Sequence, residues 1–173
     1  LQSKNNLAIL LDEEKTPEST AEAKELYREV IAGRTEHYGP RHVETLTSKM
    51  GLANLLKSEQ TLESAAEAKE LYHEVIAGYT EHYGPRHVNT LTSKMNLAVL
   101  LKNEKTPEST AEAKELYHEV IAGETEHYGP RHVKTLQSKM NLAVLLKNEK
   151  TPESTAEAKE LYHEVIAGRT EHY

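Results

Sequence analysis

The sequence has no cysteine, tryptophan or phenylalanine, so its core is built from leucine, alanine, valine, isoleucine, methionine and nine tyrosines. The absence of cysteine excludes disulfide bonds, thiolate metal sites and a cysteine nucleophile, and it fits the cytoplasmic location that we expect. Hydrophobic residues make up 37% of the chain and charged residues 28%, which predicts a folded protein rather than a disordered one.

An excess of basic residues is also missing. The 21 lysines and arginines against 28 aspartates and glutamates give a net charge of -7, which argues against a nucleic-acid partner. No apolar run exceeds the five residues 97–101, far below the roughly 20 that cross a bilayer, so we expect no membrane span. The chain opens on Leu1 without a leader, and we expect it to be a segment of a longer array.

The chain consists of tandem repeats. The triplet Glu-His-Tyr ends at Tyr38, Tyr83, Tyr128 and Tyr173, always 45 residues after the last. This period predicts four repeats in one solenoid domain, at residues 1–45, 46–90, 91–135 and 136–173. Residues 91–128 and 136–173 differ at only two positions, which indicates a recent natural duplication or an engineered repeat with no evolved ligand.

Each repeat contains two helical patterns. In the third repeat, leucines and alanines at three- and four-residue spacings predict a first helix, helix A, over residues 88–104. A second helix, helix B, is predicted to start with Thr106 as its N-cap and Pro107 at the first helical position, or one turn later at a candidate capping box, Ser109-x-x-Glu112. It stops at Gly129-Pro130. Because β-type alternation is absent and a lone hairpin cannot bury both apolar stripes, the sequence predicts an all-α, right-handed superhelical solenoid of antiparallel helix hairpins.

These patterns resemble a known repeat family. The residues that carry the resemblance are Asn96-Leu97-Ala98-x-x-Leu101 in helix A and Ala113-x-x-x-Tyr117-x-x-Val120 in helix B. They are similar to the tetratricopeptide repeat, and the joint Gly84-Pro85-Arg86-His87-Val88-Asn89-Thr90-Leu91 resembles that of the kinesin light chain subtype, with valine in place of a second proline. Here the repeat is enlarged, with three extra residues around 105–109 that lengthen either the turn or helix B. The resemblance implies a protein-binding scaffold with no cofactor.

In that family, helix A of every repeat lines a concave groove in which peptides lie. Carried over to this sequence, the resemblance implies a groove made of Asn5, Asn6, Ile9 and Asp12 in the first repeat; Met50, Asn54 and Lys57 in the second; Thr92, Met95, Asn96, Val99, Lys102 and Asn103 in the third; and Met140, Asn141, Val144, Lys147 and Asn148 in the fourth. The repeats differ at many of these positions, which favours ligand selection. The alternative is free drift on a solvent face, and the variable helix-B position at Arg34, Tyr79, Glu124 and Arg169 favours drift.

The chemistry of the groove suggests a partner. Lys57, Lys102 and Lys147 form a spaced basic row, so an acidic protein segment is expected to prefer the last three repeats. The alternative function is a structural or self-associating array, because uncapped ends predict head-to-tail stacking of chains.

Catalysis and metal binding are not expected. No phosphate loop, nucleophile elbow or pair of catalytic carboxylates is present, so we expect no enzyme. The ten histidines are mostly repeat equivalents, too far apart to share one ion. A site at His82 and His87 is the weaker alternative to a structural role in which His87 caps helix A.

Overall fold

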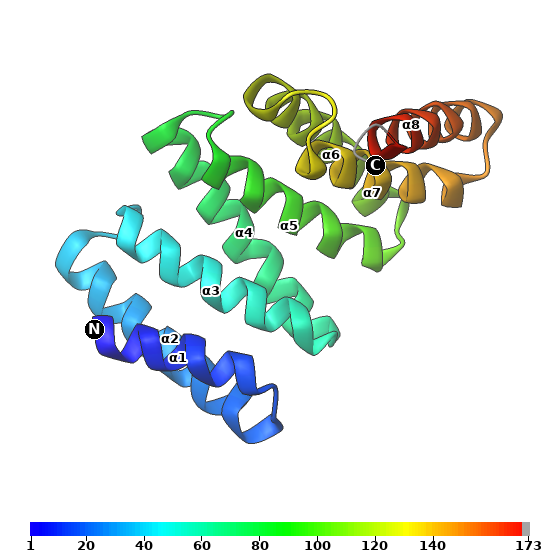
Figure 1. Ribbon diagram of the computed structural model, residues 1–173. Helices are drawn as coiled ribbons and strands as arrows, with labels where there is room; N and C mark the ends of the chain where they lie inside the picture. Colours follow the sequence, from blue (N-terminus) through cyan, green and yellow to red (C-terminus); the bar gives the residue numbers. More distant parts are fainter. Residues whose placement is uncertain (171–173) are drawn as a thin grey trace. The chain divides into compact units, whose positions relative to one another are not determined.

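The computed structural model describes residues 1–170, which form eight α-helices and no strand (Figure 1). The helices are α1 (Gln2–Glu14), α2 (Pro17–Tyr38), α3 (Val43–Glu59), α4 (Leu62–Tyr83), α5 (Val88–Glu104), α6 (Pro107–Tyr128), α7 (Val133–Glu149) and α8 (Pro152–Thr170). Odd-numbered helices are helix A of each repeat and even-numbered helices are helix B. The predicted fold class, an all-α solenoid of tandem helix hairpins, is confirmed.

The chain divides into two compact units. Unit 1 comprises residues 1–85 with α1 to α4, and unit 2 comprises residues 86–173 with α5 to α8. In each unit the helices of a hairpin pack on each other, and the second helix of the first hairpin packs on the first helix of the next. The prediction of one domain built from all four repeats stays a prediction.

The N-terminus of helix B lies at Thr106-Pro107, the earlier of the two predicted starts, and a capping box fixes it there. Thr106 is the N-cap residue of α6, and its hydroxyl accepts a hydrogen bond of 3.1 Å from the Ser109 backbone amide. Ser109 reciprocates, because its hydroxyl accepts from the Thr106 amide at 3.1 Å. The predicted box between Ser109 and Glu112 is therefore wrong. Because α6 begins at Pro107, the extra residues of the repeat lengthen helix B and not the turn.

The joint between hairpins uses glycine and histidine. Gly129 ends α6 with a φ of 94°, in the region that favours glycine, as the sequence predicted. His87 is the N-cap of α5, and its ring Nδ1 accepts a hydrogen bond of 3.2 Å from the Asn89 amide, so the predicted capping role of His87 is confirmed. His132 caps α7 in the same way.

The core runs along the hairpins as a layer between helices A and B. The helices α3, α5 and α7 each contribute five buried leucines and alanines, whereas α1 contributes only Ala8. The helices α2, α4 and α6 each contribute a buried alanine, tyrosine and valine, such as Ala113, Tyr117 and Val120. In unit 1, Gly78 on α4 allows close approach of Leu46 on α3, since a Cβ at that glycine would lie 2.5 Å from Leu46 Cδ1. Fully buried tyrosines thus replace the missing phenylalanines and tryptophans.

Candidate peptide-binding face

In unit 2 the predicted groove residues lie on one partly exposed side of α5 and α7. None of them is buried, whereas the intervening Leu97, Leu100 and Leu101 are. On α7, Lys147 and Asn148 are exposed, and Met140, Asn141 and Val144 are half-buried; on α5, Thr92 and Asn103 are exposed, and Met95, Asn96, Val99 and Lys102 are half-buried. The structure therefore gives both helices of unit 2 a polar, accessible face. That such faces form one concave wall along the chain stays a prediction.

The two helices bring some of these side chains together. Asn141 Nδ2 lies 3.7 Å from the Met95 sulfur, and the Gln137 amide donates to Asn141 Oδ1 at 3.3 Å. Predicted groove residues of adjacent repeats are thus in contact across α5 and α7. Amides held in this way present both donors and acceptors to a backbone laid along the face.

The most basic part of unit 2 is an open hollow of about 880 Å³ where the turns of both hairpins meet. Four lysines line it, and they are Lys102, Lys105, Lys114 and Lys150. Asn148 also lines it, and Glu149 is its one carboxylate. Lys114 Nζ lies 3.8 Å from the carboxylates of both Glu149 and Glu157. The four lysines therefore outnumber the carboxylates that pair with Lys114.

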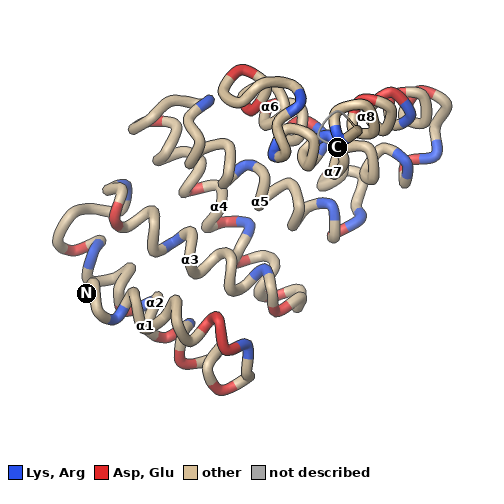
Figure 2. The backbone as a smooth tube through the Cα atoms, viewed as in Figure 1, with Lys and Arg blue, Asp and Glu red and all other residues tan. Residues whose placement is uncertain are grey.

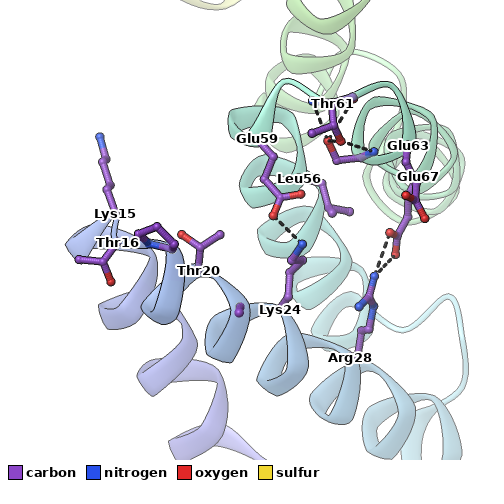
Figure 3. Close-up of a pocket in the computed structure, with 13 residues that line it drawn as sticks. Lys15, Thr16, Thr20, Lys24, Arg28, Leu56, Glu59, Thr61, Glu63 and Glu67 are labelled. Carbon is purple, nitrogen blue, oxygen red and sulfur yellow. Dashed lines mark hydrogen bonds and ion pairs between the residues drawn. The ribbon is translucent and has the colours of Figure 1, made fainter.

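Unit 1 has an equivalent hollow of about 730 Å³, and its charges are balanced. Lys24 Nζ lies 2.5 Å from Glu59, and the Arg28 guanidinium lies 2.9 Å from Glu67 (Figure 3). Lys15, which corresponds to Lys105, also lines the hollow (Figure 3). Glu59, Glu63 and Glu67 have glutamates at the equivalent places in unit 2, so the two regions differ instead in their basic residues: Asp12 and Gln60 stand where unit 2 has Lys102 and Lys150.

The helix-A face of unit 1 differs in charge, because α1 has Asp12 where α5 and α7 have Lys102 and Lys147. Burial raises the pKa of the Asp12 carboxyl; the charge of Lys15 lowers this pKa by a smaller amount, and the charge of Glu13 raises it further. Burial lowers the pKa of the Lys57 ammonium. Figure 2 shows the contrast as red segments near the end of α1 and blue ones near the end of α5. Asn6 and Ile9 on α1 are exposed, and Met50 on α3 packs against the Leu46 core.

Two predicted groove residues of unit 1 have internal roles instead. Asn5 is only 6% exposed, and its amide oxygen accepts a hydrogen bond of 3.2 Å from the Ser48 hydroxyl. Its assignment to the groove is therefore wrong, because a neighbouring helix covers it. Asn54 is half-buried and accepts a hydrogen bond of 2.7 Å from the Tyr72 hydroxyl.

The tyrosines of helix B form a feature that sequence reasoning missed. Tyr72 and Tyr117 are repeat equivalents and fully buried, and burial raises the pKa of both hydroxyls. The Tyr72 hydroxyl donates to Asn54, which lies 18 positions earlier in the sequence. The residue at the same separation from Tyr117 is Val99, which has no side-chain acceptor to offer. Within residues 1–170 the Tyr117 hydroxyl is the one buried side-chain oxygen without a hydrogen-bond partner. The available signal was the single asparagine, Asn54, at a position where the other repeats have isoleucine or valine.

The histidines take part in local contacts. His82 Nε2 lies 2.8 Å from the backbone oxygen of Arg41, and His118 Nε2 lies 3.2 Å from the Glu157 carboxylate. Across residues 1–170, no three histidine or carboxylate side chains lie close enough to hold a metal ion. Over the same residues, the structure contains no helix with the length and apolar character needed to cross a membrane.

Hairpins of this kind, with an accessible helix-A face, define a helical-repeat protein. The sequence profile of the tetratricopeptide repeat family matches residues 18–44 and 45–89, and the later repeats follow the same pattern. The predicted resemblance is confirmed: residues 18–89 match the tetratricopeptide repeat family, and the repeats have the fold of the kinesin light chain type.

Three solved structures share this fold. BtubC (BKLC) from P. vanneervenii is 19% identical with a TM-score of 0.81, and the match covers 96% of this chain and 62% of that one. The nearly identical TPR-like repeats of a Podosopora anserina protein described as a kinesin light chain give 21% identity and a TM-score of 0.52, over 99% of this chain and 95% of that one. A variant of the same repeats gives 22% and 0.50, with the same coverage. The chain therefore spans less than two thirds of BtubC. No protein of curated function matched the sequence.

Proposed function

We propose that this chain is a protein-interaction scaffold whose unit 2 binds an acidic, extended segment of a partner protein. Tetratricopeptide repeats generally mediate protein–protein interactions and are typically non-enzymatic, and we propose the same for this chain. The observation that carries the proposal is the hollow lined by four lysines and a single glutamate. The equivalent region of unit 1 supports it by contrast, because Asp12 and Gln60 stand there in place of Lys102 and Lys150.

Electrostatics favours this partner over a neutral one. Unit 2 offers the excess positive charge of its hollow beside exposed Lys147 and Asn148, although the whole chain carries -7. An acidic segment is therefore repelled by most of the surface and attracted locally, which gives selectivity for one site. A cytoplasmic location is part of this proposal and rests on the cysteine-free sequence.

The test is binding of a fluorescent oligo-glutamate peptide, followed by anisotropy at low ionic strength. We expect Lys105→Ala with Lys150→Ala to weaken binding by about two- to fivefold per lysine, the range of exposed ion pairs. Lys15→Ala is the matched control, because Lys15 lies at the equivalent place in unit 1 and its removal should leave the affinity unchanged. Absent binding, or equal losses in the double variant and the control, refutes the proposal.

A second candidate function is head-to-tail self-association, and a specific observation favours it. Leu7 and Leu10 on α1 are 41% and 56% exposed, whereas their equivalents Leu52 and Leu55 on α3 are 2% and 0% exposed. Since α3 has a preceding helix B packed on it, α1 presents the apolar surface that such a helix would cover. Ile166 on α8, 60% exposed, offers the complementary helix-B surface.

Light scattering across protein concentrations tests this second function. The mass of the wild type should rise with concentration, and Leu7→Ser with Leu10→Ser should abolish the rise. Leu62→Ser is the control, because Leu62 is 93% exposed at the start of α4, away from the α1 surface. A wild type that stays monomeric at every concentration eliminates the candidate.

A further inference from the structure

The three segments that join one hairpin to the next differ from one another at only two positions. Residues 29–45, 74–90 and 119–135 are otherwise identical. The first variable position is Arg34, Tyr79 and Glu124 in the three segments, and the second, ten residues later, is Glu44, Asn89 and Lys134. Free drift would scatter differences along the segment, so their restriction to one pair calls for a physical cause.

In unit 1 the two variable residues touch across the boundary between hairpins. Arg34 is on α2, and its guanidinium lies 2.8 Å from the Glu44 carboxylate on α3. It also donates to the Ser48 hydroxyl at 2.7 Å and to the Glu44 backbone oxygen at 2.8 Å. The Arg34 side chain is only 4% exposed, so this charge is removed from water and depends on its partners. The helix-B position that appeared to drift on a free surface is therefore an interface residue.

In unit 2 the same place carries the opposite charges. Glu124 on α6 accepts a hydrogen bond of 2.5 Å from the hydroxyl of Ser138 on α7, which is the repeat equivalent of Ser48. Burial raises the pKa of the Glu124 carboxyl, while that hydrogen bond and the charges of Lys134 and His132 oppose the rise. The charges of Glu124 and Lys134 thus reverse the signs of Arg34 and Glu44, although the Lys134 ammonium lies over the Tyr128 ring, 5.2 Å from its centroid, and not against the Glu124 carboxylate.

We propose that this residue pair is a matching code that determines which hairpin docks on which. A helix B carrying arginine accepts a helix A with glutamate, and a helix B carrying glutamate accepts a helix A with lysine. Exchange of partners would place the buried Arg34 against Lys134, or the half-buried Glu124 against Glu44. Such like-charge contacts are how interfaces reject wrong partners. The partner of each surface is therefore a hairpin of this chain with the complementary charge, and the code disfavours hairpins exchanged between copies.

The test uses the full chain and converts one junction of the code into the other. Glu124→Arg alone puts an arginine opposite Lys134, and we expect a lower urea midpoint with an unfolding equilibrium constant about tenfold higher. Glu124→Arg with Lys134→Glu recreates the Arg34–Glu44 pairing and should restore the midpoint. Because both junctions then carry the same code, refolding at high protein concentration should give more exchanged oligomers than the wild type, measured by size-exclusion chromatography with light scattering.

The control is a charge swap of the exposed pair Arg41 and Glu81, which lie 2.7 Å apart in unit 1. Arg41→Glu with Glu81→Arg should change neither the midpoint nor the oligomer fraction. The code is overturned if Lys134→Glu fails to rescue Glu124→Arg. It is also overturned if the rescued variant refolds with no more oligomer than the wild type, because the pair then contributes stability without selecting a partner.

Discussion

The buried Tyr117 hydroxyl allows a sharp test of the packing between the two helices of a hairpin. It lacks a hydrogen-bond partner within residues 1–170, although the equivalent Tyr72 donates to Asn54 at 2.7 Å. Val99 occupies the position on α5 where α3 has Asn54. We predict that Val99→Asn stabilises the protein by supplying the missing acceptor, and that the mirror change Asn54→Val destabilises it by leaving the Tyr72 hydroxyl unpaired.

The expected magnitudes follow from the cost of unpaired polar groups. An unsatisfied buried group costs about 1–3 kcal/mol, and a net hydrogen bond contributes about 0.5–1.5 kcal/mol. Valine and asparagine have similar helix propensities, so the backbone contributes little to the difference. The valine is half-buried, and loss of its methyl contacts offsets part of the gain. We therefore expect Val99→Asn to stabilise by about 1 kcal/mol and Asn54→Val to destabilise by about 1–3 kcal/mol.

Urea denaturation followed by circular dichroism gives both free energies of unfolding, with Tyr117→Phe as the control background. Tyr117→Phe should itself stabilise slightly, because it deletes the unpaired hydroxyl and keeps the ring. In that background Val99→Asn has no hydroxyl to accept from, so its benefit should disappear. If Val99→Asn gives the same change with and without the tyrosine hydroxyl, the pairing is not the cause and the reasoning fails.

Three further predictions concern other buried contacts. A Cβ at Gly51 would lie 2.6 Å from the rigid ring of Tyr27, so Gly51→Ala should destabilise by about 1–2 kcal/mol in thermal melts despite the better helix propensity of alanine, and an unchanged melting temperature would contradict the packing. Burial raises the pKa of the Glu124 carboxyl above 4.5, so the stabilising contribution of its protonated form is present below that pH and is lost as the pH rises through the folded pKa. The stability of the wild type relative to Glu124→Gln should therefore fall between pH 4.5 and 7. Urea midpoints of the two proteins that move in parallel with pH would exclude this. Burial, with the charge of Asp12 as a second cause, raises the pKa of Tyr27 to about 12, so wild type should lose stability as the pH rises from 10 towards 12, and Tyr27→Phe should lose less, as alkaline melts would show.

Local rules predicted the helices and their ends well. Helix A of the third repeat spans residues 88–104 as predicted, because its leucine spacing, its histidine cap and the glycine-proline joint all lie close together in the sequence. The capping box was misplaced because the sequence rule expects glutamate or glutamine at the third helical position, whereas the Ser109 hydroxyl performs that role here.

Those local rules could not predict the contacts between hairpins. Asn5 appeared to be a surface residue because the family resemblance placed it in the groove, and Arg34 because its position varies among the repeats. Both are buried and reach Ser48 on the next hairpin. Their separations from Ser48 in sequence are 43 and 14 residues, and no helical periodicity relates residues on different helices. The hollow of unit 2 was only partly foreseen, through Lys102 and Asn148, since its other lysines lie on the turns and on helix B.

The differences among nearly identical repeats fall into two physical classes. A repeat protein needs identical packing residues to stack, but identical junctions leave the order of hairpins unspecified, because any helix B could dock on any helix A. Differences at Arg34 and Glu124 lie inside junctions, where a buried charge makes a wrong neighbour costly. Differences such as Asp12 against Lys102 lie on the helix-A face, where they alter what the surface attracts without changing the stack. The two classes meet at Arg34, because its guanidinium also donates a hydrogen bond of 2.8 Å to the Gln2 side chain on α1, so a change of junction charge reaches the edge of the helix-A face in the first repeat.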